Sequence, residues 1–180
     1  VNKEFKDIDI FLNNFQQSLY QLQHAQFPVV SCPSGLAIGG GYEVISQTSF
    51  IAAHSNSVLG LVESLVGLIP AGGGCKEMLR RWANHSDIKN DPKQLSLKVF
   101  NLIGYATTAD SPIKAKAQQF LGEQDMMVMS KDRLITEADS IIFSKKENYQ
   151  SLDSATFSLP GQTVMSDIMD ILYDLKDKKV

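Results

Sequence analysis

The chain has 180 residues, a hydrophobic content of 43% and a formal net charge of −3, which fits one ordinary globular domain with a real core. It contains no apolar run of about 18 residues and does not open on the apolar segment of a signal peptide, so we expect a cytoplasmic protein without a membrane span. The slightly acidic balance argues against nucleic-acid binding, which needs a basic face.

The first part of the chain is predicted to hold a helix and two strands. Apolar residues recur three and four apart over residues 8–22, which predicts an amphipathic helix. Short apolar runs at 29–32 and 49–53 predict buried strands. Between them, three glycines at 39–41 precede a short predicted helix over 42–47.

The rest of the chain is predicted to be helical after a second glycine-rich turn at 67–74. Helices are predicted over residues 76–82, 94–103, 112–121, 131–143 and 163–175. Strands that are followed by segregated helices indicate an α/β core with a helical C-terminal region. We place the core in residues 1–110 and the helical region in residues 111–180.

Several familiar motifs fail. The chain has no G-x-S-x-G, and therefore no nucleophile elbow. The run from Gly72 to Lys76 lacks the Gly-Lys-Ser/Thr ending of a phosphate loop, and Glu77 stands where the third glycine of a dinucleotide-binding loop would fall. The two cysteines, Cys32 and Cys75, do not form a C-x-x-C pair, and no histidine occurs at a metal-ligand spacing from either of them. We therefore predict reduced thiols and no metal site.

Two acidic residues lie beside the two glycine-rich turns. Glu43 follows Gly40 by one helical turn, so its carboxylate and the free amides of a helix N-terminus would border one site that suits a developing oxyanion. Glu63 lies at the end of an apolar stretch, where burying a lone charge is costly. Two such acids can divide acid and base work between them. On the residues alone, the favoured interpretation is a tight glycine turn with an ordinary first-turn acid at Glu43 and a surface acid at Glu63.

The segments at 28–30, 35–43, 63 and 67–73 resemble the enoyl-CoA hydratase, or crotonase, family. That family has P-V-x-A-x-x-G-x-x-x-G-G-G-x-E, a second glutamate and G-x-x-P-G-x-G-G, and the 20-residue step from Glu43 to Glu63 is the hydratase spacing. The sequence of residues 60–70, Gly-Leu-Val-Glu-x-x-Val-Gly-Leu-Ile-Pro, is most similar to the hydratase part of bifunctional 3-hydroxyacyl-CoA dehydrogenase proteins of fatty-acid oxidation.

The resemblance implies a crotonase-type ββα spiral that binds an acyl-CoA thioester and hydrates 2-enoyl-CoA to 3-hydroxyacyl-CoA. Glu43 and Glu63 would flank a water and share its activation and the protonation of the α-carbon. The backbone of Gly40, next to Gly39, would bind the thioester oxygen, beside the Pro70–Ala71 turn. Ala71 and Val62 replace a glycine and a proline of the family pattern.

The family's upstream F-S-A-G-A-D-like stretch, which supplies a second oxyanion amide, is absent from this sequence. The expectation is therefore an N-terminally incomplete module, weak or inactive alone, that needs a missing N-terminal part of the same polypeptide or forms a homo-oligomer. No cofactor is expected in this segment, and NAD only with an upstream dehydrogenase domain. Two alternatives are an enoyl-CoA isomerase, disfavoured because isomerases commonly keep one acid, and a non-catalytic remnant that acts in oligomerisation.

Overall fold

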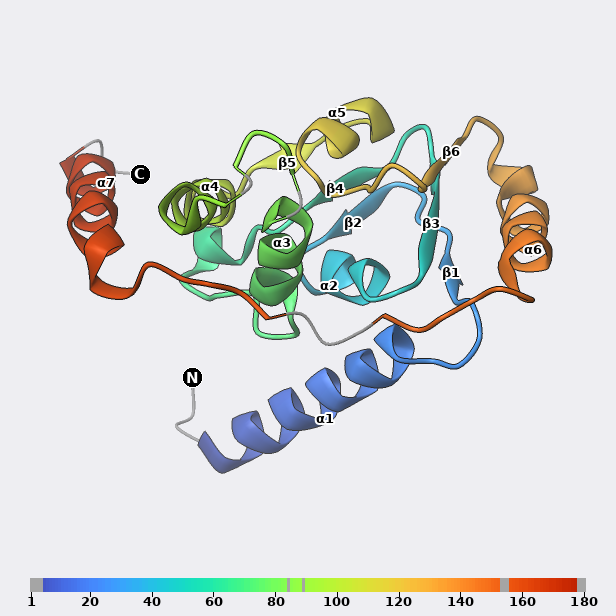
Figure 1. Cartoon of the computed structure of the whole chain (residues 1–180), viewed down its shortest axis with the longest axis horizontal. Helices are drawn as coiled ribbons and strands as arrows, with labels where there is room; N and C mark the ends of the chain where they lie inside the picture. The colour runs from blue at the N-terminus through green and yellow to red at the C-terminus, as the bar shows by residue number, and fades with distance from the viewer. Residues whose placement is uncertain (1–4, 84, 89, 153–155, 178–180) are drawn as a thin grey trace.

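The computed structural model describes residues 5–83, 85–88, 90–152 and 156–177. The chain begins with a long helix, α1 (Phe5–Gln23), which lies along one side of an α/β core (Figure 1). None of the described helices is long and apolar enough to cross a membrane.

Two three-stranded sheets make up the core. The first has the order β1 (Val30–Ser31), β3 (Phe50–His54), β6 (Met126–Val128), and all its pairs are parallel. The second has the order β2 (Leu36–Ile38), β4 (Val58–Gly60), β5 (Thr108–Ala109), and only its β4–β5 pair is antiparallel. Because β1 to β4 alternate between the sheets, the chain winds from one sheet to the other and back.

Helices surround these sheets. They are α2 (Gly40–Ser46), α3 (Gly74–Ala83), α4 (Pro92–Gly104), α5 (Pro112–Ala117), α6 (Leu134–Lys145) and α7 (Met165–Asp177), with 3₁₀ turns η1 (Glu63–Val66), η2 (Lys131–Arg133) and η3 (Gly161–Val164). The start of α4 is explained by its own residues: Pro92 lies in the first turn, and the Asp91 side chain caps the helix by accepting hydrogen bonds from two first-turn amides. Figure 1 shows α6 at one end of the molecule and α4 with α7 at the other.

The helix expected over 8–22 is present as α1, and the two expected strands are β1 and β3. The expectation of helices alone after about residue 75 is wrong, because β5 and β6 complete the two sheets. These strands have two and three residues, too few to show an alternating pattern. The division of the chain at residue 110 stays a prediction. Strand β6 follows that residue in the chain and pairs with β3 of the first sheet.

The predicted helix over 112–121 ends early. Helix α5 stops at Ala117, and Gln119 adopts a left-handed backbone with φ 58°. This turn directs Phe120 into the core, where its ring packs edge-on against Tyr42 with the ring centroids 4.9 Å apart. The Tyr42 hydroxyl donates a hydrogen bond of 3.1 Å to the Phe120 carbonyl. The α2 helix, which carries Glu43, is thereby fixed to the core.

Gly60 is a position where the fold requires glycine. A Cβ atom at Gly60 would lie 2.8 Å from the Thr107 carbonyl oxygen and 3.0 Å from the Thr108 Cα. We expect Gly60→Ala to lower the free energy of unfolding by about 1–3 kcal/mol, because backbone has to shift. Gly104→Ala is the matched control, since its nearest neighbour would be 3.9 Å away. Urea denaturation followed by circular dichroism measures both, and equal stabilities would contradict the prediction.

Candidate functional site

The first turn of α2 borders open space. Gly39 precedes the helix with φ 57° and ψ −131°, a backbone that glycine adopts without strain, and its amide donates a 2.9 Å hydrogen bond to the Gly60 carbonyl of β4. A Cβ atom added at Gly40 or Gly41 would meet nothing within 4 Å. First-turn amides have no acceptor within their own helix, so the Gly40 N–H is left without an intrahelical partner beside this open space.

Glu43 is buried on this first turn, with 3% of its surface exposed. Its Oε1 accepts a 2.8 Å hydrogen bond from the Gly74 amide, the first residue of α3. Burial raises the pKa of Glu43, the amides of Gly72 to Gly74 lower it, and the nearby Glu63 carboxylate raises it again. The pKa lies above its ordinary value on balance, which suits a group that exchanges protons.

Glu63 begins η1 and faces the same region. Its Oε1 lies 3.4 Å from where a Cβ of Gly39 would be, so the two acids flank the start of α2. Both carboxylate oxygens of Glu63 are shielded from solvent, yet neither has a hydrogen-bond partner among the residues that the structure describes. Buried carboxylate oxygens without a partner are rare in folded proteins, so the position of Glu63 is not explained by its contacts with the described residues.

Of the other predicted site residues, Val62 lies beside Glu63, whereas Pro70 and Ala71 lie in the turn before α3. Val62 lies beside Gly39 and Glu63, with its Cγ2 3.8 Å from the Cβ position of Gly39. Pro70 is buried and packs beneath the start of α3, away from open space. Ala71 is half-buried, and its carbonyl accepts a 2.6 Å hydrogen bond from Gln16 of α1. The assignment of catalytic and binding roles to these positions stays a prediction.

Sequence reasoning missed the contribution of the second glycine run. Gly74 donates its amide to the Glu43 carboxylate from the turn at 72–74, a contact that neither the family pattern nor the failed phosphate loop had predicted. Cys75 was also missed. Burial raises the pKa of its thiol, and the carboxylates of Glu43 and Glu63 raise it further, so the half-buried thiol stays protonated beside the acid pair. A glycine run directly before a predicted helix was the available signal.

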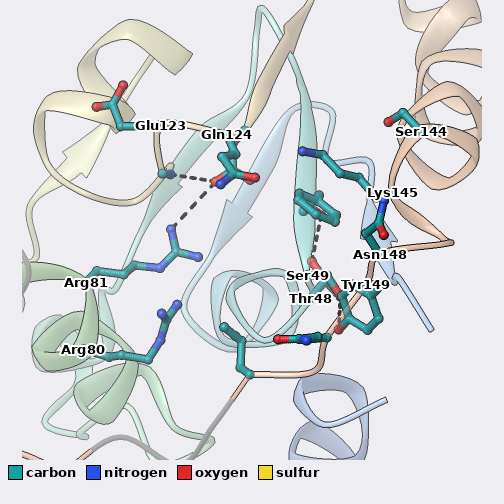
Figure 2. A pocket seen from close by; sticks show the side chains of 15 residues that line it. Thr48, Ser49, Arg80, Arg81, Glu123, Gln124, Ser144, Lys145, Asn148 and Tyr149 are labelled. Atoms are coloured by element: carbon teal, nitrogen blue, oxygen red, sulfur yellow. Dashed lines mark hydrogen bonds and ion pairs between the residues drawn. The ribbon is translucent and has the colours of Figure 1, made fainter. Parts of the chain in front are cut away.

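A cavity of about 880 Å³ lies at the opposite end of α2 (Figure 2). Arg80 and Arg81 of α3 reach it from one side, and Lys145 and Tyr149 reach it from the other. Two of the polar pairs that line it contact each other: Arg81 is within 3.9 Å of Asp125, and the Tyr149 and Ser49 hydroxyls share a hydrogen bond of 2.8 Å. Neither Glu43 nor Glu63 lines this cavity, so we do not assign the acid pair's chemistry to it.

Metal binding has no support within the described part of the chain, where no group of three or more histidine, cysteine or acidic side chains could hold an ion. The groups gathered around the start of α2 are the carboxylates of Glu43 and Glu63 and the backbone amides of Gly40 and Gly74. Together these groups can bind an oxygen atom, accept a proton and return one.

Comparison with known proteins identifies similar chains. Residues 1–90 match the family model described as enoyl-CoA hydratase/isomerase. A probable 3-hydroxyacyl-CoA dehydrogenase of Bacillus subtilis is 34% identical over 160 residues, which cover 88% of this chain and 20% of that protein. A putative fatty acid oxidation complex trifunctional enzyme of Rickettsia felis is 33% identical over 146 residues, covering 79% of this chain and 19% of the relative. The chain thus spans about a fifth of the length of these relatives.

Solved structures have the same fold. An enoyl-CoA hydratase from Bacillus anthracis superposes with a TM-score of 0.62 at 20% identity, over 80% of this chain and 48% of that one. An enoyl-CoA hydratase from Thermoplasma volcanium gives a TM-score of 0.63 at 16% identity, over 79% of this chain and 51% of that one. The likeness confirms the α/β crotonase-type fold with its helical C-terminal region, and this chain corresponds to about half of such a structure.

Proposed function

Because the chain belongs to the enoyl-CoA hydratase/isomerase family, we propose that it carries the acid pair of a hydratase module acting on 2-enoyl-CoA thioesters of fatty-acid oxidation. One observation carries the proposal: a buried Glu43, held by the Gly74 amide, faces a Glu63 whose two shielded oxygens have no partner among the described residues. Addition of water to an enoyl thioester needs one proton removed from water and one delivered to the α-carbon, which two carboxylates can share.

The amide at Gly40 would bind the thioester oxygen as negative charge develops on it. A backbone N–H aimed at such an oxygen stabilises the charge more in the transition state than in the substrate. Gly40 has open space in front of it, which leaves room for the thioester, and Glu43 lies one helical turn away. The Gly39 backbone, which lies beside Glu63 and Val62, would form part of the substrate-binding surface next to Glu63.

Hydration of crotonyl-CoA, followed by loss of the enone absorbance, tests this function. Among the described residues we identify one oxyanion donor, Gly40, and the lack of a second typically costs on the order of 10²–10³ in rate. We therefore expect the 180-residue chain to be weak or inactive by itself, slower than a complete hydratase by at least that factor. A rate near that of a complete hydratase would contradict this expectation, and conversion of a 3-enoyl-CoA in place of hydration would contradict the proposed reaction.

The protein context in which the module works is also a proposal. Many large apolar side chains are exposed on α1 and after Glu63, including Phe5, Phe11, Leu65 and Ile69. Such surface is typical of contacts with further protein, so we propose that the module works in a longer polypeptide or a homo-oligomer. A cytoplasmic location also stays a prediction.

A further inference from the structure

Helix α1 binds the segment 71–77 at both of its ends. At one end, the exposed Gln16 side chain donates a 2.6 Å hydrogen bond to the carbonyl oxygen of Ala71. At the other end, the buried Gln23 side chain donates a hydrogen bond of 3.3 Å to Oε2 of Glu77. Gln16 and Gln23 are seven residues apart, which is about two helical turns, so they lie on the same face of α1. One helix therefore holds this segment at two points.

The contact at Gln23 involves a second hydrogen bond. Oε1 of Gln23 accepts a hydrogen bond of 2.8 Å from Nζ of Lys76, while Nε2 of the same amide donates to Glu77. The amide group has a cation on its oxygen and an anion on its nitrogen, which fixes the way the group is turned. Glu77 is fully buried and also accepts hydrogen bonds from Arg80 and Arg81. This end of α1 is therefore joined to the charge cluster of α3.

Between these two points, α1 packs on the glycine run itself. A Cβ atom at Gly72 would lie 2.3 Å from Cε1 of Phe15 and 2.8 Å from Oε2 of Glu43. Gly72 therefore lies between the aromatic ring and the carboxylate, with no room for a side chain unless one of them moves. Leu19, one helical turn after Phe15, has only 3% of its surface exposed, so this face of α1 is packed against the protein.

The segment that α1 holds carries the amide that is bound to Glu43. The Gly74 N–H donates a 2.8 Å hydrogen bond to Oε1 of Glu43, and Gly74 is three residues from each end of the segment. Residues 72–74 are all glycine, whose backbone has more conformational freedom than that of any other residue. Such a run keeps one conformation only where neighbouring groups fix it, and α1 contributes contacts on both sides of Gly74.

We propose that Gln16 and Gln23 are positioning residues for Glu43: by holding both ends of the segment 71–77, they keep the Gly74 amide on the carboxylate. The inference rests on the proposed function of Glu43, and it deepens that function by naming the side chains that hold its hydrogen-bond donor in place. A catalytic group keeps its geometry only when the groups that contact it are themselves fixed by further hydrogen bonds. Loss of either glutamine therefore loosens the Gly74 amide without unfolding the chain.

The test is amide hydrogen exchange, measured by NMR on the ¹⁵N-labelled 180-residue chain at one pH. The exchange rate of Gly74 is compared with that of Ile141, which is buried on α6. We expect Gln16→Leu to raise the Gly74 rate by on the order of tenfold and to leave the Ile141 rate unchanged, because one hydrogen bond that holds the segment is lost. Gln23→Leu should raise the Gly74 rate at least as much, since it breaks two hydrogen bonds. Gln17→Leu, at an exposed neighbouring position, is the control and should change neither rate.

A rescue variant and the reference amide separate positioning from a general loss of stability. Gln16→Arg keeps an N–H donor at an exposed position, so its Gly74 rate should stay near that of the unchanged chain. The proposal is overturned if Gln16→Leu leaves the Gly74 rate unchanged, or if it speeds the exchange of Gly74 and Ile141 equally. Because Gln16 is exposed, Gln16→Leu decides the matter even if Gln23→Leu does not fold. Exchange reads no turnover, so failure of the hydratase chemistry would leave these rates as expected, and unchanged rates would leave the acid–base roles standing.

Discussion

Glu43→Gln is expected to lower the rate of crotonyl-CoA hydration by about 10²–10⁴-fold, since a positioned acid or base contributes that much to a proton transfer. The same change should leave the free energy of unfolding at pH 7 equal to or above that of the unchanged chain. A glutamine oxygen can still accept the hydrogen bond from the Gly74 amide, and the buried charge is gone. Loss of activity without loss of stability is the mark of a residue retained for chemistry.

The sign of the pH dependence follows from the raised pKa of Glu43. Burial makes the folded chain bind this proton more tightly than the unfolded chain does. The free energy of unfolding contributed by Glu43 therefore falls as pH rises from the unfolded pKa through the folded one, and the full cost is present above both. Glu43→Gln removes this dependence, so its stability advantage should be larger at pH 7 than at pH 4, where both forms are neutral.

Glu63→Gln should lower the hydration rate by a comparable factor, because both proton transfers are needed for net addition of water. Glu147→Gln is the matched control, since Glu147 is exposed on the surface beyond α6 and should leave the rate unchanged. Rates come from the enone absorbance and stabilities from urea denaturation of the same preparations. If Glu43→Gln lost activity and stability in parallel, or if neither acid affected the rate, the acid–base assignment would be wrong.

The parts of the site that the sequence predicted are local in the chain. Three glycines before a short helix indicated free amides beside Glu43, and the structure has α2 begin at Gly40. The pairing of Glu43 with Glu63 depended on the 20-residue spacing seen in a family, because no periodicity places a 3₁₀ turn against a helix start. The structure places Glu63 beside Gly39, the residue before α2, and Glu43 in the first turn of the same helix.

The missed parts depend on contacts between distant segments. Gln16 meets Ala71 across 55 residues, and Ala53 pairs with Met127 across the first sheet. The apolar stripe on residues 8–22 predicted that one face of α1 packs, but it could not say which turn that face meets, and Ile8 and Phe11 of the stripe are exposed in the structure. Strands as short as β5 form because β4 is already in place beside them, so their own residues give little indication.

Glu77→Ala is expected to produce the largest loss of stability, about 3–5 kcal/mol, because it removes the anion from a buried group of charges. The Glu77 side chain is fully buried; its Oε1 accepts a 2.8 Å bond from Arg81 Nε, and its Oε2 accepts one of 2.9 Å from Arg80 Nε. Arg81 has only 10% of its side chain exposed, so its guanidinium cannot turn to water once Glu77 is gone. The other acid near it, Asp125, is 3.9 Å away, too far for a strong hydrogen bond.

Two further variants separate charge from shape. Glu77→Gln keeps the volume and one acceptor, so it should lose less than Glu77→Ala but still remove the negative charge nearest to Arg81. Glu147→Ala changes an exposed acid and should stay within about 0.5 kcal/mol of the unchanged chain. A Glu77→Ala loss below about 1 kcal/mol in urea denaturation would mean that Asp125 and backbone carbonyls such as that of Ser46, 3.4 Å from Arg81 Nη2, already satisfy the guanidinium. Because Glu77 lies one helical turn after Gly74, a large loss would show that the charge cluster stabilises the helix whose first amide binds Glu43.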